Sequence, residues 1–122
     1  MAKKQAAGKT FDVGARLKNI QSLYRSKRPK EAIAYMFMLY TMLCRAKYGE
    51  VKKPQQSIRE YGTIMCQTHK QNPQVVYPFI QNVEAIIYGG RQPSEEVFHQ
   101  VTESFGVVFK DIVGKQLPQL IK

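Results

Sequence analysis

The longest uncharged stretch of the chain, "AIAYMFMLYTMLC" at residues 32–44, constrains the fold most strongly. Its thirteen residues fall short of the roughly 20 that a membrane-spanning helix needs. Charged segments, "SKRPKE" and "RAKYGE", flank it on both sides. A helix that is apolar all round is typical of the centre of a bundle. The stretch therefore predicts a central buried helix, with a peripheral membrane contact as the alternative.

Proline, glycine and serine residues mark the ends of the predicted helices. Pro29 suits the first turn of the central helix, and Gly49 is a favourable stop after it. Ser57 and Glu60 have the spacing of a capping box, in which each side chain accepts from the other residue's backbone N–H. Together with the helical spacing of apolar residues, these signals predict helices over 12–25, 29–48, 58–70, 77–88 and 95–113.

Pro78 sets the predicted start of the fourth of these helices. Proline inside a helix removes a hydrogen bond and clashes with the preceding turn, at a cost of about 3 kcal/mol. We therefore expect a short turn at 73–76 before the helix over 77–88. No segment alternates with period two for long enough to form a strand. The sequence predicts an all-α bundle of about five helices with short loops, as one domain over 11–117 behind a flexible basic arm at 1–10.

The net charge of +10 is unevenly distributed. Residues 1–53 hold thirteen Lys and Arg against three acids, whereas residues 54–122 hold six of each. A basic region beside a neutral body indicates attraction to a polyanion, although solubility alone would also explain it. The candidate residues for polyanion or partner binding are Lys3, Lys4, Lys9, Arg16, Lys18, Arg25, Lys27, Arg28 and Lys30.

Aromatic residues are interleaved with these cations. In an RNA-binding protein, exposed rings stack on bases while cations contact the phosphates. The helical spacing of these rings instead favours a place in the core. Phosphate contact needs no aromatic residue, so contact with the nucleic acid backbone is still a hypothesis. The five rings are Phe11, Tyr24, Tyr35, Tyr40 and Tyr48.

Cys66 and His69 are three residues apart, the spacing of a helical half-site for a metal or of a thiol beside a base. Cys44 and His99, the only other cysteine and histidine, could complete a zinc site, but the sequence lacks the closely spaced pairs of ligands that usually indicate zinc. A catalytic pair would need a third residue to orient the base. We predict a buried thiol near a surface histidine, with no metal, no cofactor and no enzymatic activity. Two cysteines without a signal peptide suggest free thiols in the reducing cytoplasm.

Two segments resemble a known family. "PQQSIREYG" (54–62) is similar to its Thr/Ser-x-x-Glu-Tyr helix start, and "NVEAIIYGGRQPSEE" (82–96) to its helix ending in Tyr-Gly before a polar loop. The family is a helical domain of unknown function at the cytosolic C-terminus of prokaryotic membrane-anchored, transglutaminase-like proteins. The resemblance covers about residues 30–113 and implies a small docking module that is not an enzyme. The matching positions are Ser57, Glu60, Tyr61, Tyr88 and Gly89.

The sequence thus supports two functions. The leading hypothesis is a protein–protein interaction subunit of a larger assembly, with the basic N-terminal half as its electrostatic face. The alternative is an RNA- or ribosome-associated protein that contacts phosphates through residues 1–53.

Overall fold

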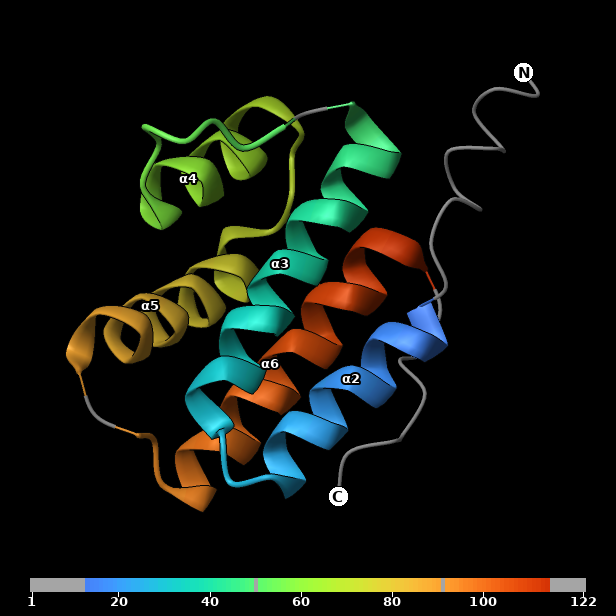
Figure 1. Ribbon diagram of the computed structural model, residues 1–122. Helices are drawn as coiled ribbons and strands as arrows, with labels where there is room; N and C mark the ends of the chain where they lie inside the picture. Colours follow the sequence, from blue (N-terminus) through green and yellow to red (C-terminus); the bar gives the residue numbers. More distant parts are fainter. Residues whose placement is uncertain (1–12, 50, 91, 115–122) are drawn as a thin grey trace.

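Five α-helices account for most of the residues that the computed structural model describes, which are 13–49, 51–90 and 92–114. No strand occurs among these residues, so the predicted all-α bundle is confirmed. The helices are α2 (Val13–Arg25), α3 (Pro29–Tyr48), α4 (Ile58–Thr68), α5 (Pro73–Gly89) and α6 (Glu95–Val113) (Figure 1).

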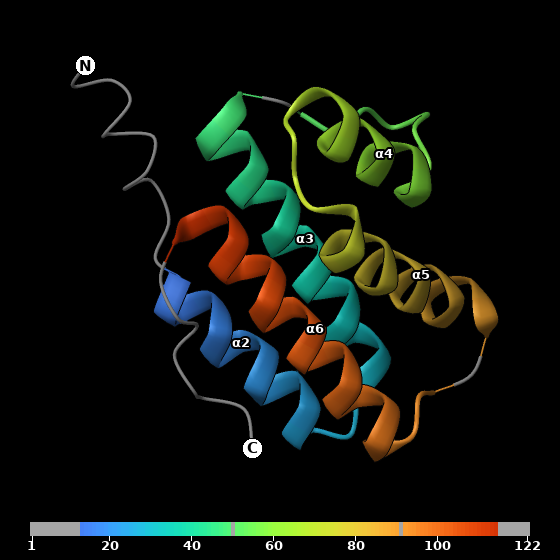
Figure 2. The ribbon, with the colours of Figure 1, turned by 180° about the vertical axis from the view of Figure 1, so that it is seen from behind.

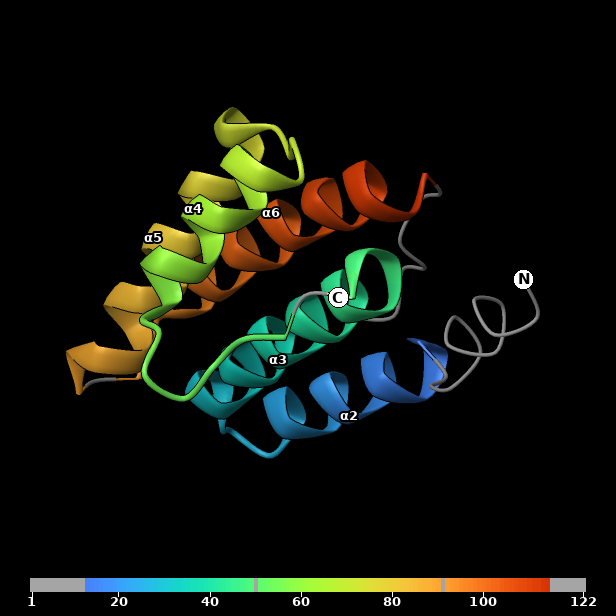
Figure 3. The ribbon, with the colours of Figure 1, turned by 90° about the horizontal axis from the view of Figure 1, so that it is seen from above.

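Helix α3 lies at the centre of the arrangement and contacts α2, α5 and α6. Seen from above, α2 and α3 form one layer, and α4, α5 and α6 form the other (Figure 3). The view from behind shows the axes of α2, α3 and α6 running in similar directions (Figure 2). This central place explains the uncharged stretch at 32–44, whose residues supply most of the buried face of α3. Of the described helices, none combines the length and apolarity needed to cross a membrane.

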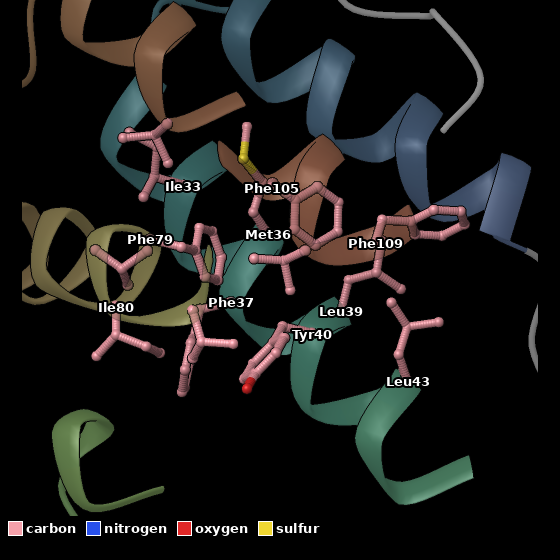
Figure 4. Close-up of a cluster of buried hydrophobic side chains, with 14 of the residues drawn as sticks. Ile33, Met36, Phe37, Leu39, Tyr40, Leu43, Phe79, Ile80, Phe105 and Phe109 are labelled. Atoms are coloured by element: carbon pink, nitrogen blue, oxygen red, sulfur yellow. The ribbon is translucent and has the colours of Figure 1, made fainter. Parts of the chain in front are cut away.

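An aromatic cluster fills the space between the two layers (Figure 4). We use this name for Phe37, Tyr40, Tyr61, Phe79 and Phe105, all buried. The ring of Tyr40 meets those of Phe79 and Tyr61 edge-on, with centroids 5.7 and 6.1 Å apart. Phe79 continues the contact to Phe105 at 5.7 Å. Each such pair adds about 0.5–1.5 kcal/mol beyond its buried area, so the cluster ties α3, α4, α5 and α6 together.

Helix α4 approaches α5 closely at Gly62. A Cβ atom at this position would lie 2.9 Å from Cγ1 of Ile80, closer than real Cβ contacts come. Gly62 is buried, and Ile80 is almost fully buried beneath it. The absence of a side chain at residue 62 therefore allows the two helices to touch.

The predicted helix ends are largely confirmed. Ser57 and Glu60 form the capping box, with Glu60 N donating to Ser57 Oγ at 3.0 Å and Ser57 N donating to Glu60 Oε1 at 2.9 Å. Gly49, Gly90 and Gly114 follow α3, α5 and α6 in the left-handed conformation. Helix α4 ends at Thr68, two residues earlier than expected.

The helix predicted over 77–88 is present, but the turn predicted at 73–76 was wrong, because α5 is continuous from Pro73 through Pro78 to Gly89. Asn72 caps its first turn by accepting from Gln74 N at 3.0 Å. Pro78 deprives only the carbonyl of Gln74 of its helical partner, and both residues are exposed, so water can replace that bond. Val76 and Phe79 are fully buried on the opposite side. Their burial offsets the local cost of the proline.

Candidate functional site: the basic surface

Several cations lie close together along the chain in α2, in the following turn and in the first turn of α3. We call Lys18, Arg25, Lys27, Arg28 and Lys30 the basic surface. All are exposed except Lys30, which is half-buried. Lys18 and Arg25 are seven residues apart on α2 and therefore share one face. The other predicted cations of the arm, Lys3, Lys4 and Lys9, lie outside the described residues.

The turn between α2 and α3 holds Lys27 in an unusual backbone conformation. Arg28 N donates to the carbonyl of Leu23 at 2.9 Å, and Lys27 N donates to that of Tyr24 at 3.0 Å. This is the Schellman pattern of helix termination, which normally places glycine where Lys27 stands. Lys27 has a φ of 64°, in the left-handed region. A side chain in this conformation costs about 1–2 kcal/mol. Residue 27 is nevertheless a lysine.

Most of the charge on the basic surface has no counter-ion among the residues that the structure describes. Arg28 forms an ion pair with Glu31. Arg28 Nε donates to Glu31 Oε1, and Arg28 Nη2 donates to Glu31 Oε2 at 2.8 Å. The hydrogen bond from Arg28 lowers the pKa of Glu31. Lys18, Arg25 and Lys27 form no ion pair within 13–49, 51–90 and 92–114. Three positive charges therefore face solvent without compensation in this part of the chain.

Contacts with α6 and its preceding loop hold the basic surface in place. The ring of Tyr24 stacks on Phe98 with a centroid distance of 4.2 Å. Lys30 N donates to Gln92 Oε1 at 3.1 Å, which anchors the first turn of α3 to the loop before α6. The cations therefore belong to elements that pack against the core.

Arg16 differs from the other predicted cations of α2. It is half-buried, and its Nη1 donates to the Tyr35 hydroxyl at 3.1 Å. Asn19 Nδ2 donates to the same oxygen at 2.9 Å. Burial alone would raise the pKa of Tyr35, but these two hydrogen bonds and the Arg16 charge outweigh it and lower the pKa. Arg16 therefore joins α2 to α3, and we do not count it in the basic surface.

The tyrosines near these cations pack in or against the core. Tyr40 is fully buried, and Tyr24, Tyr35 and Tyr48 are half-buried. Phe98 covers a face of Tyr24, and His69 covers a face of Tyr48 at a centroid distance of 4.2 Å. The prediction of a core position is confirmed for Tyr40, whereas Tyr24, Tyr35 and Tyr48 are partly buried and pack against the core. Phe11 lies outside the described residues.

The cysteines and histidines do not assemble into a site. Cys44 is fully buried, and burial raises its pKa to about 11. Cys66 is half-buried rather than buried, with a pKa also raised by burial, and His69 stacks on Tyr48. His99 lies on α6 beside Tyr24. Within the described residues, no three His, Cys, Asp or Glu side chains come together in a way that could hold a metal ion.

Gln71 is a buried polar residue that the sequence did not identify. It is only 4% exposed. Its Oε1 accepts from the Tyr40 hydroxyl at 2.8 Å, and its Nε2 donates to Tyr48 Oη at 3.3 Å and to Cys44 Sγ at 3.5 Å. The amide therefore joins the loop between α4 and α5 to α3. Its sequence context, "HKQNP", gives no sign of burial because the partners come from a distant helix.

The residues that carry the family resemblance lie at one end of the α4–α5 pair. Arg59 Nη2 and Glu84 Oε1 form an ion pair at 2.8 Å that links the two segments. Tyr61 is fully buried, whereas Tyr88 is 67% exposed and Gly89 is the last residue of α5. The structure thus gives Ser57, Glu60 and Tyr61 roles in helix capping and packing.

The sequence matches no known family model, and neither a curated protein nor a solved structure is similar to it. The case for a function therefore rests on the geometry of this chain.

Proposed function

We propose that this chain is a non-catalytic docking module that binds an acidic protein surface through its basic surface. The observation that carries the proposal is the set of exposed cations, Lys18, Arg25 and Lys27, without ion-pair partners among the described residues. Charge of one sign on a fixed scaffold speeds association with, and selects, a partner of the opposite sign. The resemblance of residues 54–62 and 82–96 to a family of helical domains implies the same kind of module. In this proposal the protein works in the cytoplasm, where its two free thiols stay reduced.

The basic N-terminal half also supports a second candidate, which is contact with RNA phosphates. The charge of residues 1–53 favours it. Recognition of single-stranded RNA usually adds stacking of bases on exposed rings. The packed positions of Tyr24, Tyr35, Tyr40 and Tyr48 argue against such stacking. Contact with phosphates alone needs no such stacking, so RNA remains the second candidate and nuclease treatment separates the two.

Affinity purification from the native lysate at low salt, with and without nuclease, tests the proposal. The tagged full chain is compared with two variants that each lose two charges. Lys18→Gln with Lys27→Gln removes charge from the basic surface. Lys70→Gln with Lys110→Gln is the matched control, because it also combines a left-handed lysine with an exposed helical one.

The proposal predicts an acidic protein that stays bound after nuclease treatment and is released by moderate salt. Its recovery should fall with the Lys18/Lys27 variant and stay near wild type with the Lys70/Lys110 variant. Loss of all bound material after nuclease would instead support RNA. Equal losses with both variants would show that net charge, and not the basic surface, determines binding.

A further inference from the structure

Helix α5 presents an exposed face that carries no charged side chain. We call Gln74, Pro78, Gln81, Ala85 and Tyr88 the α5 stripe, and all five residues are exposed. Their spacing of four, three, four and three residues places them on one side of the helix. Tyr88 is 67% exposed, more than any other large hydrophobic residue among those that the structure describes. A large aromatic side chain therefore lies in an uncharged, solvent-facing stripe.

The other four described helices differ from α5 in this respect. Each of them has an exposed charged side chain, and examples in chain order are Lys18, Arg45, Arg59 and Glu103. Helix α5 has one charged residue among its 17, Glu84, whose carboxylate is paired with Arg59 of α4. Depletion of charged residues together with an exposed tyrosine is typical of the core of a protein–protein interface. The composition of the α5 stripe therefore indicates a contact surface.

The α5 stripe also contains hydrogen-bonding groups that can serve a second chain. Pro78 has no N–H for the carbonyl of Gln74, so this acceptor lacks its partner in the helix. The hydroxyl of Tyr88 has a proton to donate, and the side-chain amide of Gln81 has both donors and an acceptor. The stripe thus holds matching donors and acceptors of its own.

We propose that two copies of this chain associate through their α5 stripes, antiparallel, about a two-fold axis at Gln81. A two-fold contact requires a surface that is complementary to itself. The α5 stripe meets this condition, because Gln74 and Tyr88 lie seven residues on either side of Gln81. Gln81 then faces Gln81 of the second copy, and Tyr88 faces Gln74, whose carbonyl can accept its proton. Pro78 and Ala85, three and four residues from Gln81, face each other.

Charge complementarity favours a second copy at this face. The chain has a net charge of +10, so contact between two copies is opposed wherever like charges meet. The α5 stripe brings no charged side chain to such a contact. Helix α5 packs against α3, α4 and α6, whereas α2 packs mainly against α3. The two helices lie on opposite sides of the molecule (Figures 1 and 3), so the cations of α2 stay away from the contact.

Sedimentation equilibrium of the full chain, from roughly 10 µM to 1 mM, tests the proposal. Five residues a side are fewer than the roughly 20–30 of a standard interface, so a weak dimer is expected. The wild type should change from monomer to dimer across this range. Gln81→Lys with Ala85→Lys should keep the chain monomeric, because like charges then meet at the axis. Gln67→Lys with Gln100→Lys is the matched control, which adds the same charge at exposed positions of α4 and α6 and should still dimerise.

A mixture of two single variants tests the antiparallel pairing. Gln81→Lys and Gln81→Glu should each weaken self-association about tenfold or more, because like charges face each other across the axis. An equimolar mixture of the two variants should recover the dimer, because opposite charges then meet.

Three results would overturn the proposal. A wild type that stays monomeric over the whole range would assign the α5 stripe to a different protein, not to a second copy. Equal weakening by the two double variants would show that net charge, and not the α5 stripe, determines self-association. A mixture of the two single variants that stays monomeric would exclude the pairing about Gln81.

Discussion

The basic surface and the aromatic cluster show opposite uses of side chains in one small bundle. In the cluster, Tyr40 and Tyr61 are fully buried, and no buried side-chain polar atom of the described residues lacks a hydrogen bond. In the basic surface, Lys18 and Lys27 are exposed and have no ion-pair partner in the described part of the chain, and Lys27 also adopts a costly backbone conformation. The contrast suggests that stability and recognition are carried by separate residues. Substitutions in one region should then leave the property of the other unchanged.

The largest effect on stability is expected from Phe79→Ala in the aromatic cluster. Phe79 is fully buried and contacts Tyr40 and Phe105. Its truncation should lower the free energy of unfolding by about 3–5 kcal/mol, because it removes buried area and leaves a cavity. Urea unfolding measures this change. Val107→Ala, at a 53% exposed position of α6, is the control and should stay within about 0.5 kcal/mol of wild type. Similar values for both variants would contradict the role of the cluster.

Alkaline pH should lower the free energy of unfolding through ionisation of Cys44. The unfolded thiol ionises near its ordinary pKa of 9.0, whereas the folded thiol keeps its proton up to a pKa of about 11. Between these values only the unfolded chain gains from ionisation, so stability falls as the pH rises, by about 2–3 kcal/mol. Urea unfolding from pH 8 to 11 measures the decline, and Cys44→Ala should make it shallower. An identical decline in that variant would assign the effect to other groups.

A smaller loss is expected when the buried amide of Gln71 is removed. Gln71→Ala leaves the Tyr40 hydroxyl without the acceptor that it uses in the fold. An unsatisfied buried polar group costs about 1–3 kcal/mol. Gln81→Ala, at an exposed position of α5, is the matched control and should be nearly neutral. If Gln71→Ala proved equally neutral in urea unfolding, the amide would not be a stabilising link between α3 and the loop before α5.

The smallest effect, and the only gain, is expected in the basic surface. Lys27→Gly relieves the left-handed conformation and should raise the free energy of unfolding by at most about 1 kcal/mol. Partner binding should weaken in the same variant, because the charge is lost. Lys27→Asn, which tolerates this conformation better than lysine, separates the loss of charge from the change in backbone freedom. If Lys27→Gly lost stability and kept full binding, stability and recognition would not be carried by separate residues as proposed.

The sequence predicted elements whose signals are local and missed those that depend on distant contacts. The start of α4 followed from Ser57 and Glu60, because both halves of a capping box lie within four residues. The continuity of α5 through Pro78 did not follow, because burial of Val76 in the tertiary structure offsets the local cost. Gln71 was not predicted for the same reason, since its partners belong to α3.

For the basic surface, too, the sequence predicted local features and missed those that depend on distant contacts. The excess of cations in the N-terminal half was visible in the sequence. The sequence did not indicate that Arg16 would bond to Tyr35, or that Lys27 would take a position that favours glycine. Both depend on how α2 meets α3.

The central claim is tested most directly by measuring the affinity of the captured acidic partner for the wild type and for the two charge variants at one low salt concentration. Isothermal titration gives the Kd, and urea unfolding of the same samples gives the stability. We predict that Lys18→Gln with Lys27→Gln weakens binding roughly tenfold, or about 1.4 kcal/mol, without loss of stability. Lys70→Gln with Lys110→Gln should change the Kd little. Equal weakening by both variants, or none by either, would contradict the assignment of recognition to the basic surface.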